Sequence, residues 1–600
     1  MSTAPGVILW LESGDKLGST GYNACAMRFS KLAEYLQELE KTSSRNQITE
    51  ILSRVFGEAS ESEIDKICYL SLGRIEPQYT GVEFNFAERM MIRAMSTAYT
   101  VDGVQILAEY KKKGDLGDVA YVVASNRRHV VGDKLFVEDV YKKLHQMAVE
   151  GGKDSQERKL EAMADLLKEV DPLSAKYIVR IPVGKLRLGF SDATILDALS
   201  LMKVGDKSAR KTIEGAYNVL SDIGKIAQQV KSHSFEHLAR EHAVPGIPVR
   251  TSLSERLPTA EKIIEKVGPK VAVEPKYDGF RTQVHVWGAG KVREVRLFSR
   301  NHENVTPMFP EIIEAAKKLP IEDGIFDGEA IGFDPETKRF VLFQQTVQRK
   351  RKHDVESKSQ QIPLKVFVFD VLYLNGEDVI ARPFSERRKL LEEVLGKSVG
   401  TIMLTRQLVI EKSGELKSAF DEYIKEGLEG VMAKKLDAPY AAGGRGFHWV
   451  KYKKHTEGEV FDTIDCVLMG AYRGRGKRAG FGVGGFLLGV PGKDGKYYSI
   501  SNLGTGLSDA QFRTMNKVVE KLKTENKPEE YFVGGTRTPD VWVSPKVVLE
   551  VLADEITSSP RHTSKYSLRF PRLIKVREDK NPDQATTVHE VETLYGMQAK

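Results

Sequence analysis

The stretch Glu274-Pro275-Lys276-Tyr277-Asp278-Gly279-Phe280-Arg281 decides how this sequence is interpreted. The apolar run 271–273 leads into it, and residues 282–287 leave it with apolar and polar side chains alternating, so both flanks are predicted to be strands. A lysine at the end of a buried strand, followed by Asp-Gly, stands at the mouth of a tight turn where a ligand can approach the backbone. The plainer alternative is an exposed, salt-bridged hairpin.

Length and composition describe a globular protein of several domains. Its 600 residues exceed a single hydrophobic core and indicate about three or four domains of ~150–200 residues. The 90 Lys and Arg residues against 83 Asp and Glu residues leave a net charge of +7, which suits a polyanionic partner without establishing one. No apolar run approaches the ~18 residues of a membrane span, so no membrane partner is expected.

Cysteine usage excludes two structural classes. Cys25, Cys68 and Cys466 are too few for a four-thiolate zinc site and too far apart for a disulfide framework. They fit a reducing compartment, and we expect the protein in the cytoplasm, at the nucleoid. Residues 1–26 carry Gly, Ser and Thr with little periodicity and are expected to be loosely ordered.

Helical patterning runs from Met27 to about residue 243. Phe29, Leu32, Leu36 and Leu39 fall on one helical face, and Ser44 with Gln47 forms a capping-box pattern for the next helix. The basic turn Lys185-Leu186-Arg187-Leu188-Gly189 suits phosphate contact, although an ordinary helix connector is an equally good interpretation. The stretch Pro245-Gly246-Ile247-Pro248-Val249-Arg250 then predicts a domain boundary.

Beyond that boundary the pattern changes to strands mixed with helices. The apolar run 365–374 has the length of a buried strand. After about residue 458, short strands alternate with glycine-rich turns, and 483–490 pairs naturally with 496–501 as a hairpin. These features predict a small barrel at the C-terminal end.

Further polar clusters follow the lysine octapeptide in order. They are Ser299-Arg300-Asn301, Asp327-Gly328-Glu329-Ala330, Phe367-Val368-Phe369-Asp370, Glu426 to Lys434, Arg445, and Trp449-Val450-Lys451-Tyr452-Lys453. Singly, each cluster has a structural explanation as core or solvated surface. Together they supply a nucleophilic amine, two carboxylates for a metal, several cations for phosphates and an aromatic face for a base.

This ordered set resembles the nucleotidyltransferase superfamily of DNA ligases, RNA ligases and mRNA capping enzymes. Over the whole chain, the sequence is similar to the ATP-dependent replicative-type DNA ligases of archaea and eukaryotes, and most similar to the archaeal members. The resemblance begins at Met27 and reaches Arg569-Phe570-Pro571-Arg572 and Arg577-Glu578-Asp579-Lys580. Because the family pattern starts at a methionine, residues 1–26 are either an extension or a misassigned start.

The resemblance implies a multidomain fold. An all-α DNA-binding domain would span 27–245, an α+β nucleotidyltransferase (adenylation) domain 246–456, and a β-barrel OB-fold 457–600. The implied activity seals nicks in duplex DNA during replication, repair and recombination. Its steps are adenylation of a lysine by ATP, transfer of AMP to the 5′-phosphate, and phosphodiester formation with the 3′-hydroxyl.

The family motifs also imply a role for individual residues. Lys276 would be the adenylated residue. Glu274 would bind the adenine side and Phe369 would stack on the base, whereas Arg281 and Arg300 would hold ribose or phosphate. The phosphates would be held by Arg445, Lys451 and Lys453. Glu329, also at the nucleotide, and Glu429 would serve Mg²⁺ or Mn²⁺.

The chemistry of a lysine nucleophile requires such neighbours. At its ordinary pKa of ~10.4, roughly one lysine in 2,500 is neutral at pH 7, a deficit of ~4–5 kcal/mol. Nearby cations and a metal would lower that pKa and would also neutralise charge developing on the α-phosphate. A divalent ion held by few carboxylates plus substrate phosphates is the usual magnesium arrangement.

The expected partner is nicked double-stranded DNA, bound by a monomer. A sliding clamp is implied by the resemblance alone, because no clean clamp-binding peptide is present. The alternatives are an RNA ligase or capping enzyme, which share the core motifs, and a non-catalytic DNA-binding protein of the same fold. The basic stretch 473–478 lacks the spacing of a phosphate-binding P-loop and is interpreted as an OB-domain loop near the DNA backbone.

Overall fold

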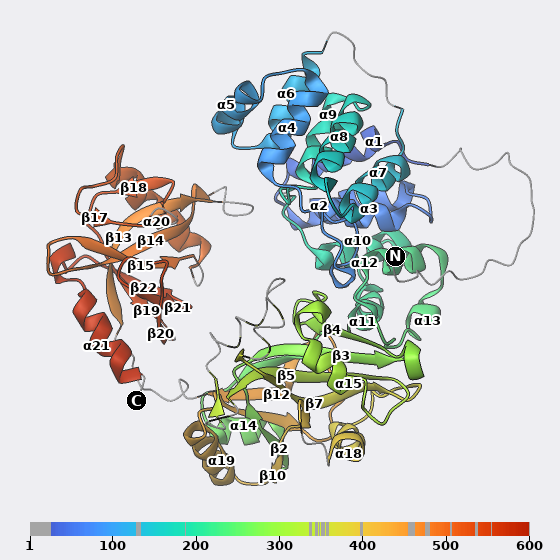
Figure 1. The fold of residues 1–600 in the computed structure, drawn as a ribbon, viewed down its shortest axis with the longest axis vertical. Helices are drawn as coiled ribbons and strands as arrows, with labels where there is room; N and C mark the ends of the chain where they lie inside the picture. The colour runs from blue at the N-terminus through green and yellow to red at the C-terminus, as the bar shows by residue number, and fades with distance from the viewer. Residues whose placement is uncertain are drawn as a thin grey trace, which may run out of the picture. The chain divides into compact units, whose positions relative to one another are not determined.

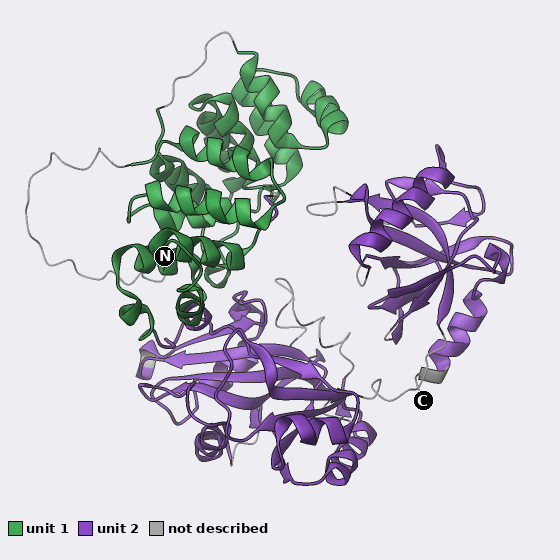
Figure 2. Ribbon diagram, turned by 180° about the vertical axis from the view of Figure 1, so that it is seen from behind, with its two compact units in different colours: residues 1–186, 190–217, 221–241 green, residues 187–189, 218–220, 242–600 purple. Residues whose placement is uncertain are grey.

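The computed structural model describes residues 26–127, 134–186, 188–334, 361–396, 400–453, 463–474, 481–504, 507–534, 538–553 and 555–598, with residues 336, 339–341, 346, 349, 355 and 359. The chain forms two compact units, which Figure 2 colours separately: residues 1–186, 190–217 and 221–241, and residues 187–189, 218–220 and 242–600. The first 25 residues, and with them almost all of the predicted extension, lie outside the description. The domain limits inferred from the sequence remain predictions.

The first unit is built of helices (Figure 1). They are α1 Phe29–Glu40, α2 Arg45–Glu58, α3 Ile64–Ser71, α4 Glu88–Tyr99, α5 Gly103–Lys113, α6 Leu116–Ser125, α7 Val137–Val149, α8 Ser155–Lys168, α9 Pro172–Arg180, α10 Asp192–Val204, α11 Arg210–Leu220, α12 Ile223–Ser232 and α13 Phe235–Leu238. The structure therefore confirms the predicted helical region. None of the described helices is long and apolar enough to cross a membrane.

The first two helices show how far local patterns reach. Helix α1 buries the predicted face of Phe29, Leu32, Leu36 and Leu39. The Ser44 side chain accepts the backbone N–H of Gln47 and begins α2, as predicted. The Gln47 side chain, however, contacts the hydroxyl of Thr42, so only one half of the capping box forms.

The basic turn 185–189 lies between α9 and α10, as predicted. The Lys185 ammonium forms an ion pair with Glu88 and donates a 3.0 Å hydrogen bond to the hydroxyl of Tyr110. Arg187 lies outside the described residues. The charge of Lys185 is thus matched inside the helical unit, and phosphate contact by this turn stays a prediction.

Two β-sheets form the central part of the second unit. The five-stranded sheet has the order β1 (Leu253–Arg256), β12 (Arg445–Lys453), β11 (Gly430–Lys435), β2 (Val271–Lys276), β10 (Leu408–Ile410). The seven-stranded sheet has the order β4 (Glu294–Ser299), β3 (Phe280–Trp287), β5 (Gly324–Asp334), β7 (Leu364–Leu374), β8 (Glu377–Asp378), with β6 (Arg339–Phe340) on β5 and β9 (Ile402–Leu404) on β7. The predicted buried strand at 365–374 is therefore confirmed as β7.

Helices complete the hydrophobic cores of both sheets. The core of the five-stranded sheet includes residues of α14 (Ala260–Val267) and α19 (Ser413–Lys425). The core of the seven-stranded sheet includes residues of α15 (Pro310–Ala316) and α18 (Phe384–Leu395). The first of these cores also includes Ile331 of β5 and Phe367 of β7, so apolar packing joins the two sheets and fixes the polar residues that their strands carry.

The lysine octapeptide connects the two sheets. Strand β2 before the turn belongs to the five-stranded sheet, whereas β3 after it belongs to the seven-stranded sheet. The simple hairpin alternative is therefore wrong, because the two flanking strands do not pair. A Cβ atom on Gly279 would lie 2.2 Å from the carbonyl oxygen of Ala330, so only glycine permits this crossing between sheets.

The polar face of β3 is buried as completely as its apolar face. Gln283 exchanges two hydrogen bonds with the backbone of Val249, at 3.0 and 2.6 Å. His285 accepts the backbone N–H of Gly246 through Nδ1 at 3.1 Å, and burial lowers the pKa of this imidazole to about 3. The segment that the sequence marks as a domain boundary is thus fastened to β3 by side chains.

The C-terminal part of the second unit is a small β-rich body. Its sheet has the order β16 (Lys523–Thr524), β18 (Val541–Val543), β13 (Ile464–Arg473), β14 (Val483–Pro491), β15 (Tyr497–Leu503), β17 (Tyr531–Phe532), and β19 (Val548–Leu552) pairs with both β13 and β22 (Arg572–Arg577). Strands β20 (Glu555–Ser558) and β21 (Tyr566–Arg569) form a separate hairpin, and the helices are α20 (Asp509–Leu522) and α21 (Val588–Gln598). The predicted hairpin is confirmed as β14 and β15, with Pro491 opposite Tyr497.

Candidate active site

One pocket of about 450 Å³ brings together the ten predicted site residues. All ten line it: Glu274, Lys276, Arg281, Arg300, Glu329, Phe369, Glu429, Arg445, Lys451 and Lys453. The five-stranded sheet contributes residues from β2 and β12, and the seven-stranded sheet contributes residues from β3, β5 and β7. Residues far apart in sequence meet because the octapeptide joins the two sheets here.

The register of the five-stranded sheet orders the chemistry along the pocket. Side chains two residues apart on a strand share a face, and paired residues lie side by side. Three rows cross β2, β11 and β12: Lys276, Gly430 and Lys453; Glu274, Met432 and Lys451; Ala272, Lys434 and Trp449. We call the part of the pocket around the first row, Arg300, Arg445 and Lys451 the cationic end. We call the part around Glu274, Lys434, Phe369 and Trp449 the aromatic end.

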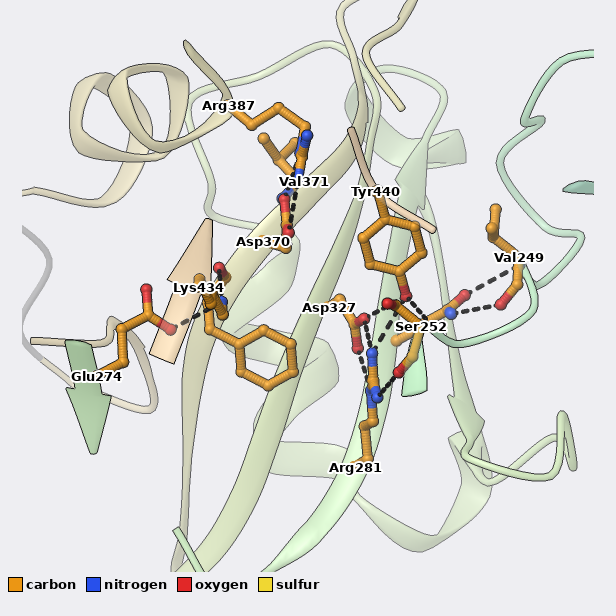
Figure 3. A network of polar contacts seen from close by, with 12 residues as sticks. Val249, Ser252, Glu274, Arg281, Asp327, Asp370, Val371, Arg387, Lys434 and Tyr440 are labelled. Atoms are coloured by element: carbon orange, nitrogen blue, oxygen red, sulfur yellow. Dashed lines mark hydrogen bonds and ion pairs between the residues drawn. The ribbon is translucent and has the colours of Figure 1, made fainter. Parts of the chain in front are cut away.

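At the aromatic end, a buried carboxylate and a buried ammonium form an ion pair (Figure 3). The Lys434 amine lies 2.7 Å from Oε2 of Glu274 and also donates to the carbonyl oxygen of Phe369 at 2.9 Å. Both charged residues are only 1% exposed. The Phe369 ring meets Trp449 edge to face at 5.7 Å between centroids. This end presents an aromatic face beside a hydrogen-bonding carboxylate, as a heterocyclic base requires.

Arg281 is held in a network of its own (Figure 3). Its guanidinium donates two hydrogen bonds to buried Asp327, at 3.0 and 2.5 Å, and one to the carbonyl oxygen of Ser252 at 2.7 Å. The hydroxyl of Tyr440 donates to the same carboxylate at 2.7 Å and accepts the backbone N–H of Ser252 at 3.0 Å. Arg281 thus anchors the chain that leads into β1, and its predicted contact with ribose or phosphate remains a proposal.

At the cationic end, one carboxylate bridges two amines. Glu429 forms ion pairs with both Lys276 and Lys453. Burial lowers the pKa of the Lys276 amine, and the Arg300 cation acts in the same direction, whereas Glu329 opposes them. The pocket therefore favours the neutral, nucleophilic form of this lysine more than water does.

Excess positive charge characterises the rest of this end. Burial lowers the pKa of Lys451, and repulsion from Lys276, Arg445 and Arg300 lowers it further. Burial raises the pKa of Glu329 to about 7, a rise that nearby Lys276 and Arg281 limit. Cations that repel one another inside a pocket are stabilised when a polyanion enters, so the cationic end is suited to phosphates.

A metal would need oxygen ligands from the substrate. Among the described residues, no group of three or more His, Cys, Asp or Glu side chains is arranged to hold a metal ion. Glu329 and Glu429 both line the cationic end. Two carboxylates beside a phosphate site fit the magnesium pattern, in which the ion binds few protein ligands and several phosphate oxygens.

These features define the class of protein as a nucleotidyltransferase: two packed sheets place a lysine between an aromatic end and a cationic end. Comparisons with known proteins then specify the family. Residues 251–453 match the ATP dependent DNA ligase domain, residues 28–200 the DNA ligase N terminus, and residues 479–580 the ATP dependent DNA ligase C terminal region. In that order, the three matches fall in the two-sheet region, the helical region and the β-rich body.

Relatives match along nearly the whole chain. A probable DNA ligase of Dictyoglomus thermophilum is 42% identical over 586 residues, covering 96% of this chain and 98% of that protein. DNA ligase of Acidianus ambivalens is 37% identical over 598 residues, with the same coverage. The solved structure Pmar-Lig_PreS3 covers 91% of this chain and 99% of its own at a TM-score of 0.55, and its 17% identity makes it a likeness of fold alone. The chain belongs to the ATP-dependent DNA ligase family.

Three residues that the sequence did not single out support the pocket: Lys434 lines it, whereas Asp327 and Gln407 contact residues that line it. Lys434 ends the predicted polar cluster Glu426 to Lys434, and a lysine directly after the apolar run Val431 to Ala433 is the sequence signal that points to it. Asp327 belongs to the predicted cluster 327–330, but its pairing with Arg281 depends on contacts that the sequence does not show. Gln407, which donates to Glu274, lies in a connection whose local sequence carries no signal.

Proposed function

We propose that this protein seals nicks in duplex DNA, using ATP as the AMP donor, in replication, repair and recombination. The observation that carries the proposal is the position of the Lys276 amine in the pocket. It lies at the end of β2, next to cations that favour phosphates, and two residues from the buried Glu274 carboxylate.

The proposed reaction has three steps: adenylation of the lysine, transfer of AMP to the DNA, and formation of the phosphodiester. The neutral Lys276 amine attacks the α-phosphorus of ATP, a P–N bond forms, the bond to the leaving pyrophosphate breaks, and the amine loses a proton. An oxygen of the 5′-phosphate at the nick then attacks the phosphorus of the lysine-bound AMP, the P–N bond breaks, the leaving lysine amine regains a proton, and AMP is transferred to the DNA. Finally the 3′-hydroxyl attacks that phosphate, loses its proton, and AMP leaves as the phosphodiester forms.

The pocket residues divide this work by position. Glu274 and Phe369 would receive adenine, Arg300 and Arg281 ribose or phosphate, and Arg445, Lys451 and Lys453 the phosphates. Glu329 and Glu429 would hold Mg²⁺, which when bound supplies positive charge at the phosphates. Glu429 also orients the Lys276 amine through their ion pair.

The remaining assignments concern DNA and cellular context. We propose that residues 27–245 grip duplex DNA through its phosphates, that 246–456 carry the adenylation chemistry, and that 457–600 form the OB-fold. A monomer acting at the nucleoid is proposed, with a sliding clamp as a further partner. Phosphate contacts predict that DNA affinity falls steeply with salt and depends little on the sequence around the nick.

The test is label transfer followed by sealing. The full chain is incubated with ATP labelled at the α-phosphate and magnesium, and acid-labile label is sought on the denatured chain. Labelled enzyme is then mixed with nicked duplex DNA or nicked duplex RNA, and joined strands are counted. Label followed by joining of DNA is expected. An unlabelled chain would indicate a non-catalytic DNA-binding protein, and joining of RNA alone would indicate an RNA ligase.

A further inference from the structure

The buried carboxylate of Glu274 is surrounded by donors. Lys434 Nζ lies 2.7 Å from Oε2, the Gln407 side-chain amide donates to Oε1 at 3.1 Å, and the guanidinium of Arg388 lies 3.8 Å from Oε1. Glu274 nevertheless lines the pocket. A carboxylate has about four acceptor positions, so these neighbours leave it able to accept another hydrogen bond from a ligand.

Lys434 is fixed in place by the aromatic end. Its amine lies 4.7 Å from the ring centre of Phe369 and 4.5 Å from those of Phe384 and Trp449. It also donates to the carbonyl oxygen of Phe369 at 2.9 Å. The same ammonium therefore holds the Glu274 carboxylate and the strand that carries Phe369 in fixed positions. Because both contact one ammonium, neither can shift without the other.

These contacts have a consequence for base selection. The ammonium of Lys434 and the side-chain amide of Gln407 place hydrogen-bond donors at the two oxygens of Glu274, so this group meets a ligand as a hydrogen-bond acceptor. Such a group pairs with an exocyclic amino group, which donates. It repels a carbonyl oxygen at the same position of the ring, because two acceptors would then face each other in a buried place.

We propose that Lys434, with Gln407 and Arg388, keeps Glu274 a hydrogen-bond acceptor and thereby makes the pocket select purines with a 6-amino group over purines with a 6-oxo group. The three are positioning residues, because they act on the base through Glu274. The proposal rests on the proposed function, in which Glu274 faces adenine. It adds to that function a chemical basis for discriminating ATP from GTP and from inosine triphosphate.

Nucleotide preference tests this inference because a purely structural role would leave it unchanged. Single-turnover label transfer is measured with ATP, inosine triphosphate and purine riboside triphosphate, which has neither group at position 6. For the unmodified chain we expect ATP to be preferred over inosine triphosphate by at least about 10³-fold, with purine riboside triphosphate between them. That order separates attraction to the amino group from repulsion of the oxo group.

The decisive variant is Lys434→Met, which keeps most of the side-chain volume among the three rings. Without the ammonium, the Glu274 carboxylate loses its nearest donor and its link to the carbonyl oxygen of Phe369, so it is no longer held in position as an acceptor and the preference for ATP should fall at least about tenfold. Lys435→Met is the matched control: it removes a lysine from the other face of the same strand, outside the pocket, and should keep the preference. Gln407→Leu, at a half-buried site, should lower the preference about threefold and supplies the test if Lys434→Met does not fold.

The outcomes are distinguishable. Equal use of ATP and inosine triphosphate by the unmodified chain overturns the inference while the proposed function stands. The inference also fails if Lys434→Met, folded by circular dichroism, loses activity with all three nucleotides by the same factor. If Lys434→Met does not fold, an unchanged preference of Gln407→Leu for ATP over inosine triphosphate also contradicts the inference. A chain that takes label from no nucleotide overturns the proposed function itself.

Discussion

The aromatic and cationic ends of the pocket treat charge in opposite ways. At the aromatic end the negative Glu274 is matched by Lys434 at 2.7 Å, and beside Phe369 the buried Asp370 is matched by Arg387 at 2.7 and 3.0 Å (Figure 3). At the cationic end positive groups outnumber the carboxylates, and Lys451 is repelled by Lys276, Arg300 and Arg445. At the aromatic end the charges are paired within the protein, whereas the surplus positive charge of the cationic end is neutralised only when an anionic ligand binds.

This difference follows from what each end is proposed to bind. A base is uncharged, so the residues around it must satisfy one another before it arrives, since a buried unpaired charge is strongly destabilising. Triphosphate brings its own negative charge, so surplus cations are neutralised on binding. Substitutions at the cationic end should therefore affect chemistry, and those at the aromatic end should affect nucleotide affinity and choice.

The largest effect is expected for Lys276→Ala. No other amine is expected to reach the α-phosphorus, so label transfer from ATP should fall by about 10⁴-fold or more. Joining of a nick that already carries AMP should persist weakly, because that step does not use the amine. The exposed Lys270→Ala, just before β2, is the control and should label normally. Undiminished labelling of Lys276→Ala would disprove the assignment of the nucleophile.

Glu429→Ala should reduce label transfer by about 10²–10³-fold. The change releases both Lys276 and Lys453 and removes a proposed magnesium ligand, so raising the magnesium concentration should recover little activity. The nearby Glu426→Ala, which loses only an exposed pair with Arg406, should stay close to normal. Normal activity of Glu429→Ala at every step would contradict the assignment of Glu429 as a magnesium ligand.

Arg300→Met should shift the pH profile of Lys276. Arg300 helps to lower the pKa of that amine, so its removal should raise the pKa and reduce the neutral fraction at a given pH, about tenfold for each pKa unit. The measurement is the rate at which an amine-directed reagent modifies Lys276 in the free enzyme across pH, followed by peptide mapping. We expect the midpoint below 10.5 in the unmodified chain and higher in the variant. Identical profiles would exclude Arg300 as a cause.

Phe369→Leu should give the smallest effect. It removes aromatic stacking but leaves the charges in place, so the KM for ATP should rise about 2–10-fold while kcat changes little. Steady-state labelling and sealing at varied ATP separate the two constants. A fall in kcat with unchanged KM would place Phe369 in the chemical step and remove the distinction between the two ends.

The sequence by itself determined the local elements and the kinds of chemistry present. The face of α1, the Ser44 cap, the strand β7 and the β14–β15 hairpin all follow from periodicity and turn residues within short windows. All ten residues that motif order and residue type selected line the pocket.

Only the tertiary structure decided how those elements combine. That β2 and β3 enter different sheets depends on long-range strand pairing, which a flanking pattern of alternation does not encode. The polar face of β3 is buried because the segment around Gly246 and Val249 lies on it. Glu274 meets Lys434 and Gln407, a partner 133 residues away along the chain, because packing brings β2, β11 and the approach to β10 together. Charge pairing between distant segments is set by register and packing, and no local propensity determines either.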